Sequence, residues 1–361
     1  MLTKTFREMK YRRMGRSGLW VSEVGLGLWK WGDPSYDGSR VGEHEGFRIL
    51  DRALELGVTH WDTANSYNMG SGNSERLLGR YFASRGRKTR YEVILATKVA
   101  NPVREEHVLS QDFSPNEVGA SRRYLIQAVD DCLRRLQTDW IDVLYHHAPN
   151  LLPDGSWETP LEETWDALNG LVSQGKVRYL AVSNRTIAQL EQESDALARV
   201  ASNPARCIVG VQNRYNLLQR AAVSASGADS TIADEEAFLA HLARHQIGLV
   251  PYMPLAVGML TGRYRPGHVD AAGRLSEESG EPWRAELVTE KNLSLVESLA
   301  ALAREKGCTL AQLAIAWLLS HDVVCSVIAG VTRMEQLEEN RGAVAVSCAS
   351  DELQELDRLT R

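Results

Sequence analysis

Several side chains that can hold or move a proton follow three successive apolar runs of this sequence. Asp62 ends one run and Tyr67 lies five residues beyond it, Lys98 ends the next, and His146 and His147 close the third. Taken singly, such an aspartate is usually a helix cap, the lysine is solvated and a histidine is a satisfied half-buried residue. A carboxylate, a phenol, an ammonium and an imidazole together can perform acid–base chemistry. Their coincidence on successive runs therefore predicts a functional site.

These groups meet only if the runs are adjacent strands. The runs alternate with longer amphipathic stretches, and most are continuously apolar, as is typical of parallel strands buried on both faces. We predict eight strands, over residues 24–28, 58–62, 93–98, 141–146, 177–183, 207–212, 248–252 and 324–329. We predict helices over residues 44–56, 74–85, 121–137, 160–174, 186–199, 234–245, 290–305 and 310–320.

Eight strands that are each followed by a helix favour an α/β fold of the (β/α)₈ TIM-barrel type over the alternative, an open doubly wound sheet. In such a barrel, chemistry lies at the C-terminal ends of the strands. Length alone allows one domain or two, but no shift in composition marks a boundary, so we predict one domain over residues 1–361. Residues 1–22 are expected to form an N-terminal extension and hairpin that turns at Gly15 to Gly18. Long loops are expected over residues 100–120, 218–233 (an insertion) and 256–288.

Composition excludes several classes of protein. The net charge is −6 without a basic block, so neither nucleic acid nor an anionic membrane is an expected partner. The five cysteines are widely spaced and form no C-x-x-C, which argues against disulfides and structural zinc and suits a cytoplasmic protein. The sequence has no run of about 18 apolar residues that could span a membrane, and its N-terminus does not resemble a signal peptide.

Two motifs carry no function in our interpretation. Gly25-Leu-Gly27 does not complete a dinucleotide-binding fingerprint, because tryptophans rather than a helix follow it. His241 and His245 lie four apart on a predicted helix, where they could hold a metal, but no third ligand has suitable spacing. We interpret them as a solvated helix face and predict no metal site.

Motifs along nearly the whole chain, from about residue 10 to 358, resemble the aldo-keto reductase superfamily. They are WDTANSY, LATK, LRRLQTDWIDVLYHH, VSN, VQNRYN, PLAVGMLTGRY and IAGVTRMEQLEEN, in the order of the family. GLWKWG, GSGNSE and YNLLQR are most similar to a bacterial branch that includes glyceraldehyde-3-phosphate reductases. The potassium-channel β-subunits are more distant.

The resemblance implies an oxidoreductase that transfers a hydride between NADP(H) and a carbonyl or alcohol. Tyr67 would be the general acid or base, and Lys98 would lower the phenol pKa from its usual value of about 10. Asp62 would hold Lys98 in an ion pair, and His147 would orient or polarise the carbonyl. Some relatives carry Glu in place of His147 and reduce a carbon–carbon double bond, so the histidine favours carbonyl chemistry.

The same resemblance implies a cofactor site. Ser183, Asn184 and Gln212 would bind the carboxamide, and Tyr252 would stack on the nicotinamide. Further residues would bind the pyrophosphate (Leu255, Gly258, Arg263 and Gly330), the 2′-phosphate (Thr332, Arg333 and Gln336) and the adenine amine (Glu339 and Asn340). An arginine near the 2′-phosphate predicts a preference for NADP(H).

The substrate is expected to be an aldehyde, ketone or sugar in a pocket walled by aromatic side chains. Trp31 is the stronger candidate, followed by Trp29, and His146 either faces this pocket or packs beside it.

Two rival functions are weighed. The first is an NADP-binding interaction or regulatory subunit with low turnover, which resembles the channel β-subunits. The second is a metal-free hydrolase or isomerase on the same barrel. The sequence leaves the substrate, the direction of flux and the oligomeric state open, a homo-oligomer included.

Overall fold

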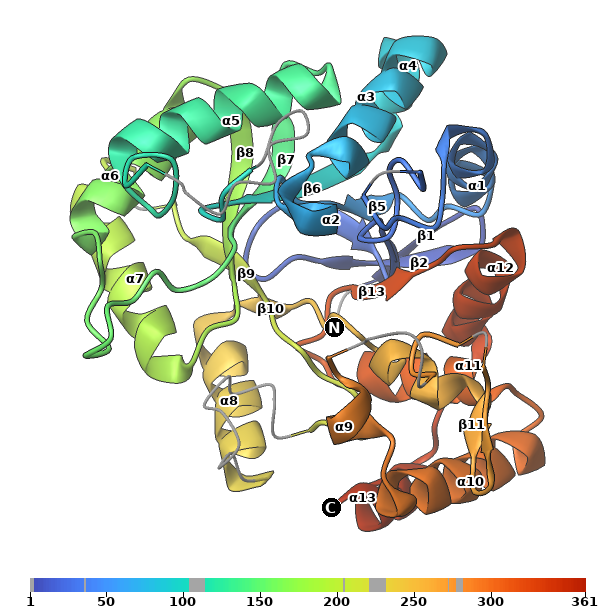
Figure 1. The fold of residues 1–361 in the computed structure, drawn as a ribbon. Coiled ribbons are helices and arrows are strands. Elements are labelled where there is room, and N and C mark those ends of the chain that lie inside the picture. Colours follow the sequence, from blue (N-terminus) through green and yellow to red (C-terminus); the bar gives the residue numbers. More distant parts are fainter. Residues whose placement is uncertain are drawn as a thin grey trace.

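The computed structural model describes residues 3–35, 37–103, 114–203, 205–220, 232–271, 273–276 and 282–361. Most of the expected insertion at 218–233 and half of the expected loop at 100–120 lie outside these residues. Figure 1 shows strands in the centre and helices around them.

Eight parallel strands form the central sheet. Their spatial order is β10, β9, β8, β7, β6, β5, β4 and β13. Their bounds are β4 (Val24–Gly27), β5 (His60–Asp62), β6 (Ile94–Val99), β7 (Ile141–His146), β8 (Val177–Ser183), β9 (Ile208–Gln212), β10 (Gly248–Leu249) and β13 (Val327–Gly330). Parallel bridges from Leu249 to Val324 and from Tyr252 to Ile328 join the two edge strands. The sheet is therefore a closed (β/α)₈ barrel, as predicted.

The strand after residue 247 is shorter than predicted. Pairing of β10 stops at Leu249, and residue 251 is a proline, which has no N–H for the ladder. The chain continues along the barrel through single hydrogen bonds, from Val250 N to Val211 O (2.9 Å) and from Tyr252 N to Asn213 O (3.0 Å). Tyr252 therefore still lies at the barrel rim.

Helices cover the outside of the barrel. The long ones are α1 (Glu43–Glu55), α3 (Asn73–Arg85), α5 (Arg122–Leu136), α6 (Leu161–Ser173), α7 (Ile187–Val200), α8 (Ile232–His245), α10 (Glu290–Glu305), α11 (Leu310–Leu319), α12 (Met334–Gly342) and α13 (Ser350–Thr360). Helix α5 shows how the sequence forms them. Its buried face includes Leu125, Ala128, Cys132 and Leu136, and the side chain of Ser121 caps its N-terminus.

A three-stranded antiparallel sheet precedes the barrel: β1 (Thr3–Phe6), β2 (Met9–Arg13) and β3 (Trp20–Ser22). The β2–β3 hairpin was predicted, whereas β1 was not. Gly15 lies in the hairpin turn with φ +56°, and a Cβ there would meet the backbone oxygens of Val209 and Gln246 at 2.4 and 2.6 Å. The turn therefore packs against the barrel end opposite the predicted site, and Met14 joins the core inside the barrel.

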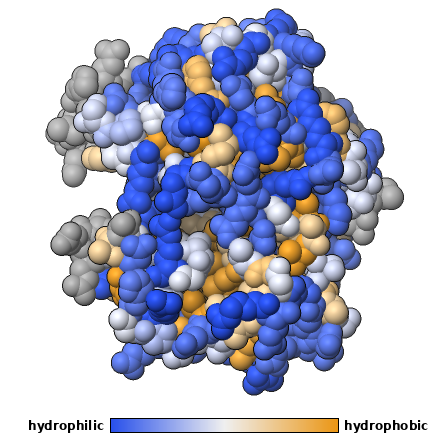
Figure 2. Space-filling view, turned by 90° about the vertical axis from the view of Figure 1, so that its right-hand side faces the viewer, coloured by the Kyte–Doolittle hydropathy of each residue, from blue (hydrophilic) through white to orange (hydrophobic). Residues whose placement is uncertain are grey.

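The predicted loop at 256–288 contains short regular elements. They are the 3₁₀-helix η2 (Ala256–Thr261), the strands β11 (Tyr264–Arg265) and β12 (His268–Val269), and α9 (Arg284–Leu287). The other short elements are α2 (Tyr67–Gly70), α4 (Arg87–Glu92) and η4 (Ala343–Ala345). On the face of the molecule in Figure 2, hydrophilic residues predominate and hydrophobic residues are exposed in small groups between them.

Candidate active site

The carboxyl ends of β5 and β6 bring a carboxylate, an ammonium and a phenol together. Lys98 Nζ lies 2.6 Å from Asp62 Oδ2 and 2.7 Å from Tyr67 Oη, and the phenol donates to Asp62 Oδ2 at 3.1 Å. Lys98 also donates to Thr63 O at 2.9 Å, and Gln212 Nε2 donates to Asp62 Oδ1 at 2.9 Å. The ion pair is therefore buried, and its polar atoms are hydrogen-bonded. It lies on the inner side of the barrel rim.

The direction of the Tyr67 pKa shift differs from our expectation. Burial and the Asp62 carboxylate raise the pKa of Tyr67 well above its ordinary value. Burial also lowers the pKa of Lys98, although Asp62 opposes this shift. The net shift is therefore opposite to the lowered pKa that we predicted, because burial and the Asp62 carboxylate, which accepts a hydrogen bond from the phenol, outweigh the opposing effect of Lys98. Tyr67 is thus a neutral phenol at pH 7.

His147 follows β7 and faces the same space. Its ring lies edge-on to that of Tyr67, with the centroids 6.3 Å apart. Nδ1 lies 3.1 Å from Asn101 Nδ2 and 3.5 Å from Ser66 Oγ. Burial, followed by the positive charges of Lys98 and Arg185, lowers the pKa of His147 well below its ordinary value. The imidazole is therefore neutral.

The structure places His146 away from this space, which corrects its assignment as a substrate residue. Its Nδ1 lies 2.8 Å from Glu193 Oε1 and 2.7 Å from Arg185 Nη2, and its Nε2 lies 3.0 Å from Asn150 Oδ1. Successive residues of a strand point to opposite faces, so His146 at the end of β7 packs among buried charges outside the barrel. It belongs to a structural network.

A cavity of about 460 Å³ opens over these side chains. Asp62, Tyr67 and His147 line its floor, and Trp29 lines its side, with its ring centroid 6.5 Å from that of Tyr67. Trp29 is 37% exposed, whereas Trp31 is fully buried and donates from Nε1 to Val331 O at 2.8 Å. Our preference for Trp31 over Trp29 as a pocket wall is therefore wrong, because the turn after β4 points Trp31 into the core.

The four predicted carboxamide and ring contacts line this cavity together. Tyr252 Oη donates to Asn184 Oδ1 at 2.7 Å, and Ser183 Oγ donates to Gln212 O at 2.7 Å. Asn184 has φ +62°, an uncommon conformation for any residue other than glycine, and also donates to His147 O at 3.0 Å. This backbone conformation presents the amide side chain to the same cavity as Tyr67 and His147.

The far end of the cavity is formed by η2 and by the loop between β13 and α12. Six predicted cofactor residues line it: Leu255, Gly258, Arg263, Gly330, Thr332 and Gln336. The predicted residues Arg333, Glu339 and Asn340 lie on α12 or at its start but are not part of the lining. Arg333 is the exposed N-cap, and Asn340 is buried with no partner for Nδ2 among the described residues. Those three assignments stay predictions.

Basic residues that sequence reasoning missed also line the cavity. They are Lys30, Arg40 and Arg274, of which Lys30 and Arg274 lie over the Trp29 ring, at 5.0 and 4.9 Å from its centroid. Lys30 directly follows Trp29, which we had predicted to line the pocket, so this position in the sequence could have identified Lys30. Arg274 lies far along the chain, and no sequence pattern marks it. A cavity lined by several cations and by residues at a helix N-terminus suits an anionic ligand.

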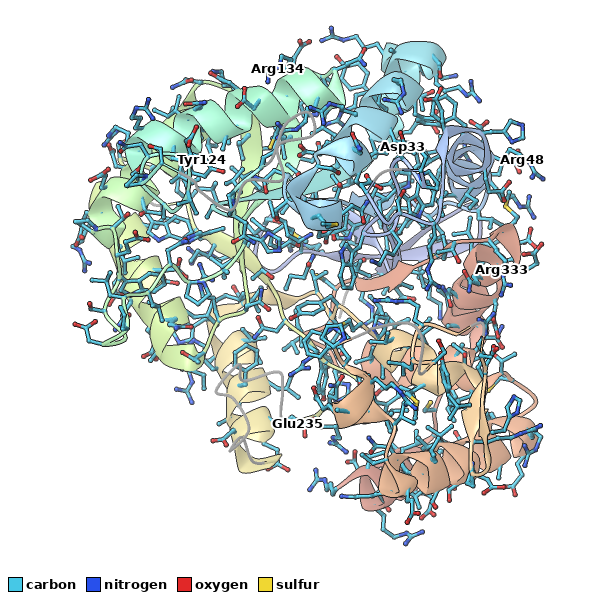
Figure 3. The ribbon with its side chains drawn as sticks, viewed as in Figure 1. Asp33, Arg48, Tyr124, Arg134, Glu235 and Arg333 are labelled. Atoms are coloured by element: carbon cyan, nitrogen blue, oxygen red, sulfur yellow. The ribbon has the colours of Figure 1, made fainter. Side chains whose placement is uncertain are left out.

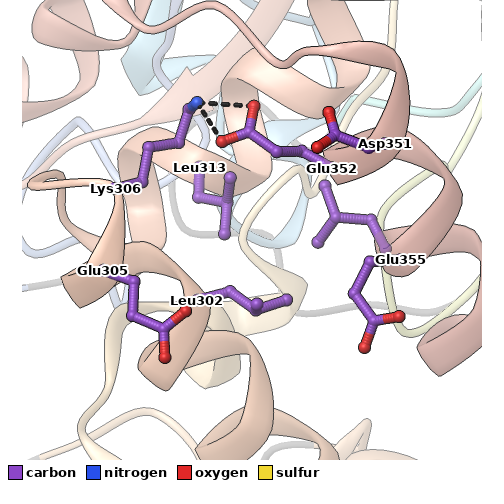
Figure 4. A pocket seen from close by; sticks show the side chains of 8 residues that line it. Leu302, Glu305, Lys306, Leu313, Asp351, Glu352 and Glu355 are labelled. Atoms are coloured by element: carbon purple, nitrogen blue, oxygen red, sulfur yellow. Dashed lines mark hydrogen bonds and ion pairs between the residues drawn. The ribbon is translucent and has the colours of Figure 1, made fainter.

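A second, smaller cavity of about 270 Å³ lies between α10, α11 and α13 (Figure 4). Its cation, Lys306, is bound to both carboxylate oxygens of Glu352. The other polar groups of its wall are carboxylates, so it resembles an ordinary acidic surface groove. Within the described ranges, no group of three or more His, Cys, Asp or Glu residues is arranged to hold a metal. No helix in that part of the chain is long and apolar enough to cross a membrane.

The fold and the site together define a (β/α)₈-barrel protein with a polar pocket at the carboxyl ends of its strands, and comparison with known proteins specifies the family. Residues 23–361 match the aldo/keto reductase family, to which this chain belongs.

The match to each of three relatives covers nearly the whole length of both proteins. L-glyceraldehyde 3-phosphate reductase of Escherichia coli (strain K12) is 31% identical over 357 residues, 98% of this chain and 93% of that protein. A probable voltage-gated potassium channel subunit beta of Arabidopsis thaliana is 32% identical over 343 residues, 94% of this chain and 92% of the other. Versiconal hemiacetal acetate reductase of Aspergillus parasiticus is 29% identical over 359 residues, with 97% and 96% covered. The family and its reductases support an oxidoreductase.

Proposed function

We propose that this protein is an NADP(H)-dependent reductase that interconverts a carbonyl and an alcohol, with Tyr67 as the proton donor. The observation that carries the proposal is the position of Tyr67 Oη, within hydrogen-bond distance of both Lys98 Nζ (2.7 Å) and Asp62 Oδ2 (3.1 Å) at the floor of the cavity. When bound, NADPH supplies a hydride to the carbonyl carbon.

The residues of the chain then manage the charge on the carbonyl oxygen. Tyr67 passes its proton to that oxygen, and the hydrogen bond from Lys98 stabilises the phenolate as it forms. The raised pKa of Tyr67 keeps the proton on the phenol until the carbonyl oxygen becomes a stronger base as it gains negative charge. His147 is neutral and donates a hydrogen bond to the same oxygen, which favours carbonyl over double-bond reduction. Asp62 keeps Lys98 charged.

We assign cofactor-binding roles to residues of the cavity lining. Ser183, Asn184 and Gln212 suit the carboxamide, and Tyr252 suits the nicotinamide ring. Arg263 and the N-terminus of α12, with Thr332 and Gln336, suit the phosphates. The proposed substrates are small aldehydes, ketones or sugars that fit beside Trp29.

Replacement of Tyr67 by Phe tests the proposal. We expect kcat for NADPH-dependent reduction to fall by roughly a hundredfold or more, because the proton donor is lost. Quenching of tryptophan fluorescence by NADPH should be retained. The matched control is Tyr81→Phe, since Tyr81 is also buried and also donates to an aspartate, Asp51, at 2.8 Å, but outside the barrel.

A Tyr67→Phe variant that keeps wild-type turnover would contradict the role of Tyr67. The wild-type protein should be screened with short aldehydes, phosphorylated glyceraldehydes, keto sugars and aromatic aldehydes, and in reverse with NADP⁺. Binding of NADPH without turnover on any of them would instead support a docking or regulatory subunit, as the names of some relatives suggest.

A further inference from the structure

One neighbour of His147 was not singled out by the sequence and does not line the cavity. Asn101 lies two residues beyond the end of β6, and its Nδ2 is 3.1 Å from His147 Nδ1. An amide NH₂ group can only donate, so Nδ1 must offer its lone pair. In a neutral imidazole the hydrogen is then on Nε2. We propose that Asn101 is a positioning residue that fixes His147 in the Nε2–H tautomer.

Asn101 is held in place by its own backbone. Its carbonyl oxygen accepts a hydrogen bond from Tyr124 Oη at 2.8 Å and another from Asn65 Nδ2 at 3.2 Å. Tyr124 belongs to α5 and Asn65 to the loop after β5, so two separate elements fix the residue. The amide therefore reaches Nδ1 from a constrained position.

The other contact of Nδ1 does not select a tautomer. Ser66 Oγ lies 3.5 Å away, a longer approach, and a hydroxyl can donate or accept. The charged and titratable groups around the ring are Lys98, Arg185, His146 and the phenol of Tyr67. None of these neighbours offers Nδ1 a carboxylate. The amide of Asn101 is thus the group that determines the tautomer of His147.

The tautomer determines what His147 offers a ligand. His147 lines the cavity, and its Nε2 has no hydrogen-bond partner within the described part of the chain. With hydrogen on Nε2 the ring can donate to a carbonyl oxygen, whereas the Nδ1–H tautomer would direct a lone pair at that oxygen. This consequence rests on the proposed function, but the tautomer itself does not.

Two variants of similar size test the inference. Asn101→Leu removes the donor, and Asn101→Asp replaces it by an acceptor. Nitrogen NMR of ¹⁵N-histidine-labelled protein, with His147 assigned by its loss in His147→Gln, gives the tautomer without cofactor or substrate. We expect the wild type to show a protonated Nε2 and a bare Nδ1 at pH 7, and Asn101→Asp to show a protonated Nδ1.

The pH dependence of kcat provides a second readout, because its direction in Asn101→Asp is characteristic of the tautomer change. A carboxylate at residue 101 raises the pKa of His147, and the neutral ring then carries its hydrogen on Nδ1. Below that raised pKa the imidazolium still donates a hydrogen bond from Nε2. The kcat of Asn101→Asp should therefore fall by about a hundredfold as the pH rises through the raised pKa of His147. Asn101→Leu should lower kcat by about twofold at all pH values, because both tautomers are then populated and only the Nε2–H form donates to the carbonyl oxygen. NADPH affinity should not change in either variant.

The control is Asn150→Asp, the same substitution next to the neighbouring histidine, since Asn150 Oδ1 faces His146 Nε2 at 3.0 Å. It should leave the His147 nitrogen resonances unchanged. The inference is overturned if the wild type shows a bare Nε2, or if Asn101→Leu and Asn101→Asp leave the His147 resonances as in the wild type. If the resonances change as expected while kcat does not, the tautomer assignment stands and the proposed role of His147 in catalysis is wrong.

Discussion

Lys98 Nζ lies 2.6 Å from Asp62 Oδ2, and both side chains are 1% exposed. Such a pair contributes little net stability compared with apolar residues of the same size, but removal of one member leaves the other charge buried and uncompensated. This asymmetry makes the pair testable by stability as well as by turnover.

We expect Asp62→Asn to lower the free energy of unfolding by about 3–5 kcal/mol, as measured by urea denaturation at pH 7. Addition of Lys98→Met should recover part of that loss without recovery of turnover. Asp130→Asn is the control, because Asp130 pairs with Lys176 at the surface and its loss should cost at most about 1 kcal/mol. An Asp62→Asn variant as stable as the wild type would show that Lys98 is not charged in the folded protein.

Trp29 and Trp31 should have different mutant phenotypes. Trp29→Ala should raise KM for the carbonyl substrate about tenfold with little effect on stability, because this ring is partly exposed at the cavity wall. Trp31→Phe should leave KM unchanged and lower the free energy of unfolding by about 2 kcal/mol, since it empties part of the core and leaves Val331 O without its donor. The reverse pattern in steady-state kinetics and denaturation would restore Trp31 as the pocket residue.

Arg333 should set the cofactor preference. It lies at the start of α12, where a 2′-phosphate would meet the helix N-terminus, whereas Arg48 lies on α1 (Figure 3). Arg333→Ala should weaken NADPH binding about tenfold and leave NADH binding unchanged, as measured by fluorescence titration. Arg48→Ala, which removes another exposed arginine, should alter neither. Equal weakening of both cofactors by Arg333→Ala would place the arginine at the pyrophosphate instead.

Stability should fall as the pH falls from 6.5 to 4, in part because of His60. Burial lowers the pKa of His60 from 6.5 to about 4, and its Nδ1 lies 2.9 Å from Ser326 Oγ. Between these two values the unfolded chain binds a proton that the folded chain does not. The contribution of His60 to stability is therefore complete above pH 6.5 and is lost toward pH 4, with a slope of at most about 1.4 kcal/mol per pH unit.

Denaturation at several pH values checks this linkage. His60→Gln should reduce the slope over that range, although His147, His241 and His321, whose pKa values are also lowered, keep part of it. His44→Gln removes an exposed histidine and should not change the slope. If both variants show the wild-type slope, the proton uptake comes from other groups.

The regular elements were largely predictable from the sequence. The predicted bounds of β7 and β8 agree with the structure, as do those of α10, because long apolar runs and amphipathic periods are local properties. The short strand β1 was missed, because TKTF has no apolar pattern and is exposed throughout. Its pairing with β2 depends on backbone hydrogen bonds, which leave no sequence pattern.

The sequence alone determined which residues stand at the strand ends. Asp62, Lys98 and His147 lie at or just beyond the carboxyl ends of buried parallel strands. Such strands must align these ends at one rim, so the proximity of the three residues follows from the pattern. Only the tertiary structure decided how each group is oriented and charged. The turn after β4 buries Trp31, the end of β7 directs His146 to Glu193, and the loop after β6 brings Asn101 to His147. The pKa of Tyr67 is likewise set by burial and by the distance to Asp62. These properties depend on contacts between segments far apart in the chain, which local sequence patterns do not contain.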